Sequence, residues 1–131
     1  MAHQFRQHYT PDEARALLPQ LRAWLKELQQ FHQRATQSDE RVGQLLASGA
    51  EVGGPLVNQL IQDRCKMRRL LAEFARREIQ IKDLDRGLID FPAFVSGREV
   101  FLCWEQDEDD IEYWHDIETG YAGREKLRGE D

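Results

Sequence analysis

The chain has 131 residues, and its 18 Lys and Arg against 24 Asp and Glu give a formal net charge of −6 at pH 7. A charge of this sign argues against a protein whose whole surface binds nucleic acid or anionic membrane. Charged residues make up 32% of the chain and hydrophobic residues 40%, which is typical of a globular protein and not of a disordered one. This length fits one domain, which we predict over residues 1–131.

The sequence carries no sign of a membrane or secretory protein. The amino-terminal residues include no apolar segment of a signal peptide, and no run approaches the roughly 18 apolar residues of a membrane span. Cys65 and Cys103 are far apart, and a disulfide scaffold would carry more cysteines, so we expect reduced thiols. We therefore predict a cytoplasmic protein without a membrane partner.

The first predicted element is a long helix over residues 10–47. Thr10, Pro11 and Glu13 have the spacing of a capping box with proline in the first helical position. Apolar residues then recur at steps of three and four, which is the pattern of a coiled-coil seam. The seam consists of Leu17, Leu21, Trp24, Leu28, Phe31, Ala35, Val42 and Leu45, with Ser38 as its polar member.

A second amphipathic helix is predicted to follow a glycine-rich turn and to run from about Pro55 to Lys82. A short loop between two long amphipathic helices favours an antiparallel hairpin, here over residues 10–82. Two helices cannot bury their apolar faces alone, so we expect a further layer from the rest of the chain or from a second copy.

After Gly87 the apolar period changes to that of strands. Residues 88–94, 98–105 and 111–117 are rich in β-branched and aromatic side chains and predict a three-stranded antiparallel meander within 83–124. The predicted fold class is α+β, a long antiparallel two-helix hairpin followed by this small meander, with a mobile tail at 125–131. The middle strand is apolar on both faces. We expect helices on one face and a partner subunit or the C-terminal tail on the other.

Charge is distributed unevenly between these segments. Residues 56–82 hold seven basic against three acidic side chains, whereas 99–118 hold nine acidic ones and no Lys or Arg. We interpret the two regions as facing each other, within the subunit or across a dimer. The basic run at 64–69 lacks interleaved aromatic residues, so we interpret it as a solvated helix face and do not expect nucleic-acid binding.

Short motifs in the last third of the chain occur in a recognisable order. They are Lys82-Asp83-Leu84, Gly87-Leu88, Asp90-Phe91-Pro92, Gly97-Arg98, Leu102-Cys103-Trp104, Trp114-His115-Asp116 and Gly120-Tyr121-Ala122-Gly123-Arg124. Together with the start of the first helix, these motifs resemble an uncharacterised prokaryotic family known as domain of unknown function 2203. The chain departs from the family's Gly-Glu-Pro pattern at Asp107, Glu108 and Asp109. The resemblance implies membership of the family and carries no activity with it.

Two residues in the meander are candidates for acid–base catalysis or metal binding. His115 is followed by Asp116, and a carboxylate can fix the tautomer of a catalytic or ligating histidine. A structural histidine is the alternative, because His115 shares a strand face with Tyr113. Asp90 lies in an otherwise apolar strand, where a buried carboxylate needs a partner or a purpose. We expect Arg98 across the hairpin as that partner.

A third acidic candidate for metal binding is Asp83. Asp83, Asp85 and Gly87 are spaced like the start of a calcium loop, but Leu88 and Phe94 replace the glycine and glutamate that the loop requires. We therefore interpret Asp83 and Asp85 as residues that cap the turn between the second helix and the first strand, and we predict no bound metal ion or other cofactor.

Three further residues are candidates for ligand binding. Arg98 and Arg124 are possible anion holders, and Trp114 is a candidate pocket wall or interface anchor. Trp104 is interpreted as core. We interpret Cys103 as an inert buried thiol, because its acidic surroundings raise the pKa of a thiol.

These features leave two hypotheses for the function, and whether the protein is an enzyme stays open. The first is a non-enzymatic adaptor that forms a homodimer through its helical seams and binds a protein partner through the meander. The second is a small-molecule- or metal-binding protein, or an enzyme, with its site in 83–124 formed by Asp90, Arg98, His115 and Arg124. The second requires Asp90 and His115 to lie on the same side of the sheet.

Overall fold

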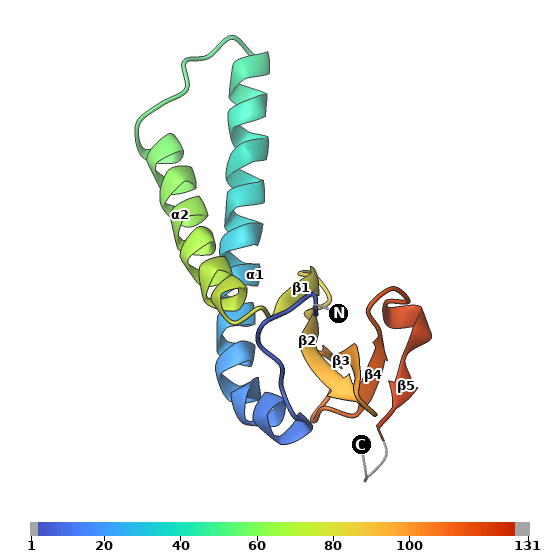
Figure 1. Ribbon diagram of the computed structural model, residues 1–131. Helices are drawn as coiled ribbons and strands as arrows, with labels where there is room; N and C mark the ends of the chain where they lie inside the picture. The colour runs from blue at the N-terminus through green and yellow to red at the C-terminus, as the bar shows by residue number, and fades with distance from the viewer. Residues whose placement is uncertain (1–2, 128–131) are drawn as a thin grey trace. The chain divides into compact units, whose positions relative to one another are not determined.

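The structure is a computed structural model that describes residues 3–127 (Figure 1). The chain forms two compact units, one of the residues up to Ala23 together with those from Phe74 onward, and one of Trp24–Glu73. The helices and strands are α1 (Pro11–Ala47), α2 (Pro55–Arg76), β1 (Gln80–Asp83), β2 (Leu88–Val95), β3 (Arg98–Glu105), β4 (Tyr113–Asp116), the 3-10 helix η1 (Tyr121–Gly123) and β5 (Glu125–Lys126). The α+β class is confirmed.

The predicted capping box at the start of α1 is confirmed. The Thr10 N–H donates to Glu13 Oε1 at 2.9 Å, and the Glu13 N–H donates to Thr10 Oγ1 at 3.1 Å. These bonds satisfy two backbone donors that the first turn of a helix otherwise leaves free. The long helix ends at Ala47, as expected. Within the described residues, neither α1 nor α2 is apolar over the length that a membrane span requires.

The predicted end of the second helix at residue 82 is wrong, because α2 stops at Arg76. The Glu78 N–H donates to Ala75 O at 3.0 Å and the Ile79 N–H to Phe74 O at 3.1 Å. This is the pattern of a Schellman motif, whose residue in the left-handed region is Glu78 with φ 57°. Glycine usually fills that position, so the sequence gives no warning that the helix ends there.

The prediction of three strands is also wrong, because the sheet has five antiparallel strands in the order β1-β2-β3-β4-β5. β1 has four residues and its pairing with β2 shifts register between Ile81 and Asp83, while β5 has only two residues. Strands this short carry too few alternations to be read from the sequence. β5 includes two residues of the predicted mobile tail, and residues 128–131 of that tail lie outside the described chain.

The sheet is buried on both faces, as expected from the middle strand. Ile89, Phe91, Leu102 and Trp104 form one apolar face, and Arg22 of α1 lies over the Trp104 ring at 5.3 Å. The opposite face is covered within the chain by residues 4–9, which we call the N-terminal strap, where a partner subunit or the C-terminal tail was expected. The Phe5 ring of the strap contacts the Phe101 ring, with 5.3 Å between their centroids.

The strap has no regular secondary structure and is held by two carboxylates. Glu99 accepts the backbone N–H groups of Gln4 and Phe5 at 2.8 and 3.1 Å, and it contacts His8 Nε2 at 2.7 Å. The side chain of Glu78 accepts the next two N–H groups of the strap at 2.8 and 2.7 Å. Glu78, just after the end of α2, and Glu99, on β3, therefore hold the N-terminal strap in place.

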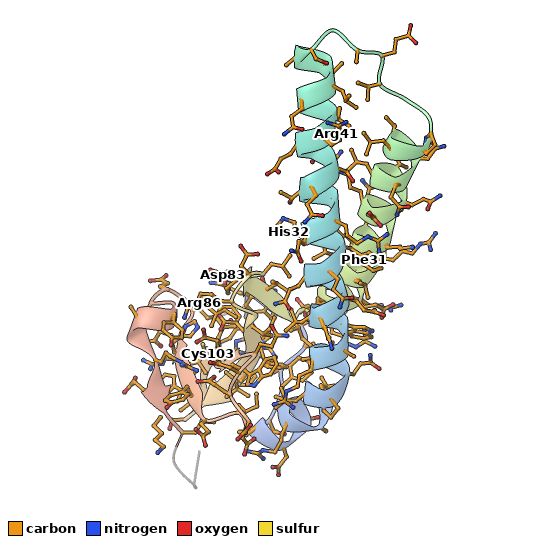
Figure 2. The ribbon with its side chains drawn as sticks, turned by 180° about the vertical axis from the view of Figure 1, so that it is seen from behind. Phe31, His32, Arg41, Asp83, Arg86 and Cys103 are labelled. Carbon is orange, nitrogen blue, oxygen red and sulfur yellow. The ribbon has the colours of Figure 1, made fainter. Side chains whose placement is uncertain are left out.

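The unit formed by Trp24–Glu73 contains a buried carboxylate that the sequence did not single out. Asp63 is fully buried, and its Oδ1 accepts a hydrogen bond from Gln59 at 3.0 Å and pairs with Arg34 at 3.2 Å. Arg64 pairs with Asp39 at 2.6 Å, and Lys66 lies 5.2 Å from the centre of the Phe31 ring, which Figure 2 labels.

Candidate metal centre

Three neighbouring strands each place one potential metal ligand on the same face of the sheet. Asp90 lies on β2, Cys103 on β3 and His115 on β4. The two-residue turn at Ser96 and Gly97 pairs β2 with β3 so that Asp90 is directly opposite Cys103. The pairing of β3 with β4 places His115 opposite Phe101, one position along the same face from Cys103. The sheet register therefore brings together residues that are 12 or more positions apart in the chain.

The ligand atoms of these residues form a compact cluster. The Asp90 carboxylate, the Cys103 sulfur and a His115 ring nitrogen all lie within 4.8 Å of one another. The three residues are 1%, 0% and 1% exposed, respectively. Among residues 3–127, this is the one group of three or more such side chains found this close together.

The hydrogen bonds of His115 determine its tautomer. Nδ1 lies 2.7 Å from the backbone oxygen of Asp116, and because a carbonyl oxygen only accepts, Nδ1 carries the hydrogen. Nε2 lies 2.9 Å from Asp90 Oδ2. Burial lowers the pKa of His115, but the hydrogen bonds with Asp90 and with Asp116 O, together with the negative charge of Asp90, outweigh burial, so the pKa is raised above its ordinary value.

Asp90 retains unused bonding capacity, and Cys103 beside it is a neutral thiol. The Asp90 Oδ1 is buried and has no hydrogen-bond partner. The cost of removing this oxygen from water is therefore not offset. Burial, followed by the negative charge of Asp90, raises the pKa of the Cys103 thiol to about 12. The thiol is therefore protonated at neutral pH, which argues against Cys103 as a nucleophile.

Beside Cys103, two arginines and two tyrosines form a stack of rings and guanidinium groups. The Arg124 guanidinium lies 3.9 Å from the ring centre of Tyr113, the register partner of Cys103, and 4.6 Å from that of Tyr121. Arg86 lies on Tyr121 at 4.5 Å. Cation–π contacts at these distances are within the attractive range.

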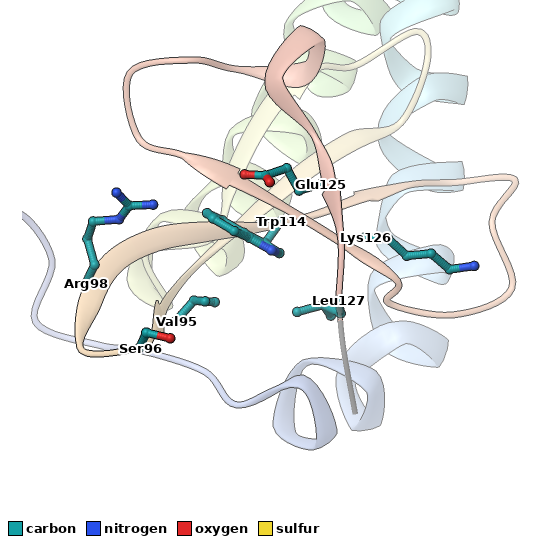
Figure 3. Close-up of a pocket in the computed structure, with 7 residues that line it drawn as sticks. All are labelled: Val95, Ser96, Arg98, Trp114, Glu125, Lys126 and Leu127. Carbon is teal, nitrogen blue, oxygen red and sulfur yellow. The ribbon is translucent and has the colours of Figure 1, made fainter. Parts of the chain in front are cut away.

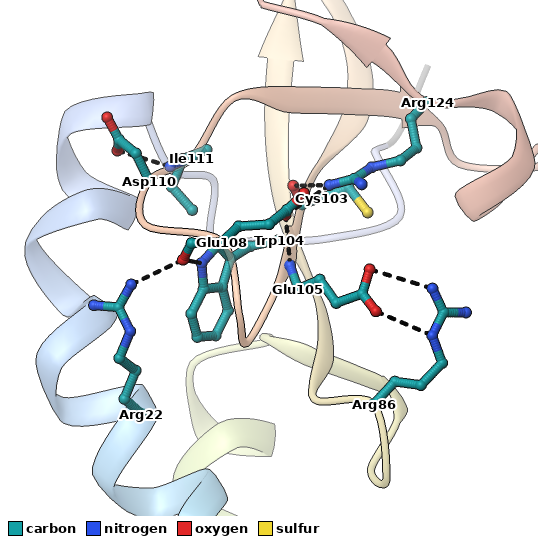
Figure 4. A network of polar contacts seen from close by, with 9 residues as sticks. All are labelled: Arg22, Arg86, Cys103, Trp104, Glu105, Glu108, Asp110, Ile111 and Arg124. Carbon is teal, nitrogen blue, oxygen red and sulfur yellow. Dashed lines mark hydrogen bonds and ion pairs between the residues drawn. The ribbon is translucent and has the colours of Figure 1, made fainter.

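The two arginines of the stack also bind carboxylates, as Figure 4 shows. Arg124 Nη2 donates to Glu108 at 2.8 Å and to the backbone oxygen of Cys103 at 3.4 Å. Arg86 donates to both oxygens of Glu105, at 3.1 and 3.2 Å. The Nε of Arg124 is buried and has no hydrogen-bond partner.

The structure does not bring all of the predicted site residues together. Arg98 and Trp114 lie on the other face of the sheet and line a pocket with Val95 and Leu127 (Figure 3). The expected pairing of Asp90 with Arg98 is wrong. Arg98 instead pairs with Asp116 at 3.1 Å, because alternation along the strands places Arg98 and Asp90 on opposite faces.

Asp83 lies at the turn between β1 and β2, outside the cluster. Its Oδ1 accepts the backbone N–H of Arg86 at 3.1 Å, and Figure 2 labels both residues. Asp83 therefore caps a turn as expected, but this turn joins two strands and not a helix and a strand. Asp83 is not among the clustered ligands of the described chain.

The residue that sequence reasoning undervalued is Cys103. A signal for it was present, because a two-residue turn at Ser96 and Gly97 requires Asp90 to face Cys103. No such signal existed for His115. The loop of residues 106–112 between β3 and β4 is longer than a two-residue turn, and its length does not determine how the two strands pair.

The acidic loop itself is held by hydrogen bonds to its surroundings. The Glu108 N–H donates to Glu105 O at 2.8 Å, and Arg22 Nη2 donates to the backbone oxygen of Asp109 at 3.2 Å. Arg22 Nη2 also donates to the backbone oxygen of Glu108 at 2.9 Å (Figure 4). A turn therefore forms at Glu105–Glu108 although the chain lacks the glycine and proline of the family's pattern.

The fold and the cluster define a two-helix α+β protein whose five-stranded sheet buries three potential metal ligands on one face. The chain belongs to the family described as uncharacterized conserved protein (DUF2203), whose family model matches residues 7–127. The family resemblance seen in the motifs is thereby confirmed. Comparisons with curated proteins and with solved structures found no match. The function must therefore be argued from the site.

Proposed function

We propose that this protein binds a transition-metal ion, with Asp90, Cys103 and His115 as ligands. The observation that carries the proposal is the approach of one oxygen, one sulfur and one nitrogen ligand to within 4.8 Å of one another, on a rigid sheet. The sequence-based expectation of no metal is thus replaced by a proposal that rests on the sheet register.

The chemistry of the ligand set favours Zn²⁺. A mixture of thiolate, imidazole and carboxylate suits a borderline-soft ion, whereas Ca²⁺ and Mg²⁺ take oxygen ligands. Binding would displace the thiol proton of Cys103, because a coordinating thiol is deprotonated. The raised pKa of Cys103 without metal then means that metal binding releases a proton at neutral pH.

The surroundings of His115 and Asp90 support the same role. A metal-bound histidine usually donates its other N–H to an oxygen that orients the ring, and His115 Nδ1 already does so to Asp116 O. Nε2 and the carboxylate then face the position of the ion. The unpartnered Asp90 Oδ1 would gain a positively charged neighbour there, which removes the cost of its burial.

The test is metal binding by the purified full-length chain after treatment with a chelator. We expect calorimetry with Zn²⁺ to give one site per chain, with heats in different buffers that reveal proton release. Asp90→Asn should weaken binding at least tenfold, because it removes the anionic ligand.

Asp63→Asn is the matched control, since Asp63 is equally buried and also has an unpartnered oxygen but lies outside the cluster. It should bind Zn²⁺ as the wild type does. Absence of saturable binding in the wild-type protein would overturn the proposal, as would equal affinity in Asp90→Asn.

A catalytic acid–base role for Asp90 and His115 has less support. Both side chains are buried, and neither lines the pockets found on the surface of the described residues. A general base must reach the proton that it abstracts.

A second candidate function is self-association through the helices, favoured by the exposed apolar side chains Leu46, Ile61 and Leu71. The ion pairs Arg34–Asp63 and Asp39–Arg64 support an antiparallel helical pair that presents these residues. A homodimer would bury them. Light scattering should then give a dimer mass, and Ile61→Ser with Leu71→Ser should give a monomer. A monomeric wild type would contradict this candidate.

Two further expectations accompany these proposals. A protein partner of the meander and a location in the cytoplasm both stay predictions, supported by the composition of the chain. Trp114 is 9% exposed and lines an open pocket, which makes its surroundings the first place to look for a partner on the meander.

A further inference from the structure

Two buried polar groups lack partners on the ligand-bearing side of the sheet, and they have opposite character. Asp90 Oδ1 is an acceptor without a donor, and Arg124 Nε is a donor without an acceptor. Leaving a buried polar group unpaired is costly, so two such groups near one site need an explanation. The proposed metal ion would satisfy the first and leaves the second unexplained.

Cys103 lies next to both groups. It is paired with Asp90 across β2 and β3, and its backbone oxygen accepts a hydrogen bond from Arg124 at 3.4 Å. Arg124 also stacks at 3.9 Å on the ring of Tyr113, which is paired with Cys103 across β3 and β4. Figure 4 draws the Arg124 guanidinium beside Cys103. The unpartnered N–H therefore belongs to the surroundings of the proposed metal centre.

The number of protein ligands points the same way. Three protein ligands leave a tetrahedral ion with an open fourth position, which in proteins is filled by water or by an exogenous ligand. A carboxylate and a thiolate already neutralise a divalent ion. A further anion at the ion is therefore best held by a hydrogen-bond donor, and Arg124 offers its unpartnered Nε–H, because Glu108 is bound through a different nitrogen, Nη2.

We propose that the metal centre binds a small anionic co-ligand at its fourth position, and that Arg124 Nε holds this anion by a hydrogen bond. The proposal rests on the metal-binding function proposed above. The co-ligand belongs to the class of small oxygen- or nitrogen-donor anions, such as carboxylate or azide, because it must bind the ion and accept a hydrogen bond from Arg124 Nε beside three ligands that are 1%, 0% and 1% exposed.

The position of Arg124 is well defined, which such a role requires. Its guanidinium lies between the rings of Tyr113 and Tyr121, at 3.9 and 4.6 Å from their centres. Its hydrogen bonds to Glu108 and to Cys103 O fix the plane of the group. A guanidinium held in this way loses little conformational entropy when it binds an anion.

The test uses the protein loaded with Co²⁺, whose visible spectrum reports changes in coordination, and azide as the probe anion. We expect azide to change the cobalt spectrum of the wild type saturably. Arg124→Gln should bind Co²⁺ as the wild type does but require at least tenfold more azide, because it loses the Nε–H and the charge. Acetate, titrated in the same way, extends the test to carboxylates.

Arg86→Gln is the matched control. Arg86 stacks on the other side of Tyr121 and binds Glu105 through both Nε and Nη2, so it has no unpartnered Nε. Its azide affinity should equal that of the wild type. If Arg124→Gln does not fold, Arg124→Lys replaces it, and the same tenfold loss is expected because an ammonium cannot place a donor where Nε stands.

The outcomes separate the two proposals. Co²⁺ binding without a response to azide, or with equal azide affinity in wild type and Arg124 variants, would overturn the co-ligand and leave metal binding intact. A tenfold loss in Arg86→Gln would also overturn it, because a general change in the stack would then explain the effect. Failure of the wild type to bind Co²⁺ and Zn²⁺ would overturn both.

Discussion

Both faces of the sheet contain fully buried residues, but the kinds of residue that they bury differ. On one face Ile89, Phe91 and Trp104 are 0% exposed and pack as an ordinary apolar core. On the other face Asp90 and His115 are almost as buried, yet they are polar and only partly satisfied. Burying apolar groups stabilises a fold, whereas burying polar ones costs free energy unless they are paired.

The difference between the two faces indicates which part of the sheet binds a ligand. The residues of the apolar face are accounted for by hydrophobic packing. The polar face contains hydrogen-bonding atoms that have no partner, Asp90 Oδ1 and Arg124 Nε. The N-terminal strap and the stacked Arg124 lie on this face. Unpartnered atoms of this kind in a well-packed sheet indicate a ligand.

The largest effect is expected on the apolar face. Trp104→Ala should lower the free energy of unfolding by about 3–5 kcal/mol, because it removes a fully buried indole and its 2.9 Å hydrogen bond to Glu108 O. Urea unfolding followed by circular dichroism measures the change. A loss below about 1 kcal/mol would show that this face is not the core of the sheet.

On the polar face, stability should depend on metal. At a free Zn²⁺ concentration about 100 times the dissociation constant, the wild type should gain about 2.7 kcal/mol, since the ion binds only the folded chain. Cys103→Ser should lose this gain and Cys65→Ser should keep it, because Cys65 is an exposed helical residue. Thermal unfolding with and without Zn²⁺ tests the pair. An equal gain in both variants would remove Cys103 from the site.

The strap that covers the polar face should contribute less, and in a pH-dependent way. Burial opposes ionisation of Glu99, but hydrogen bonds from His8 and from the N–H groups of Gln4 and Phe5 outweigh it and lower its pKa below 4.5. The resulting stability is present above pH 4.5 and is lost as the pH falls through the lower folded-state value.

Glu99→Gln should therefore cost about 1–3 kcal/mol at pH 7 and flatten the fall in stability below pH 4.5. Urea unfolding between pH 3 and 7 measures both effects. Glu118→Gln, at an exposed position, is the control and should leave the profile unchanged. A Glu99→Gln profile identical to that of the wild type would contradict the role of the strap.

The smallest effect is expected at the turn between β2 and β3, which determines which residues lie on each face of the sheet. Ser96 has φ 51° in the two-residue turn that sets the register of β2 and β3, and a slip of one residue would exchange their faces. Ser96→Asn should raise stability by about 0.5–1 kcal/mol, because asparagine tolerates the left-handed region better. Ser96→Val should lower it. The opposite order in chemical denaturation would show that the turn is not strained.

Much of the architecture follows from the sequence because it depends on local patterns. The start of α1 follows from a capping box, and β3 occupies the predicted residues 98–105 because it is a short run rich in β-branched and aromatic side chains after a Ser-Gly turn. The end of α2 does not follow, since Glu78 adopts a conformation that only its surroundings support. The two edge strands are too short to give a pattern.

By itself the sequence determined the two helices, the central strands and the family. It also identified Asp90 and His115 as candidate site residues. Only the tertiary structure decided that these two meet at 2.9 Å with Cys103 beside them, while Arg98 and Trp114 lie on the opposite face. Periodicity tells which side chains share a face of one strand. Register between strands decides which of them touch, and across the 106–112 loop that register is set by packing and hydrogen bonds that no local pattern encodes.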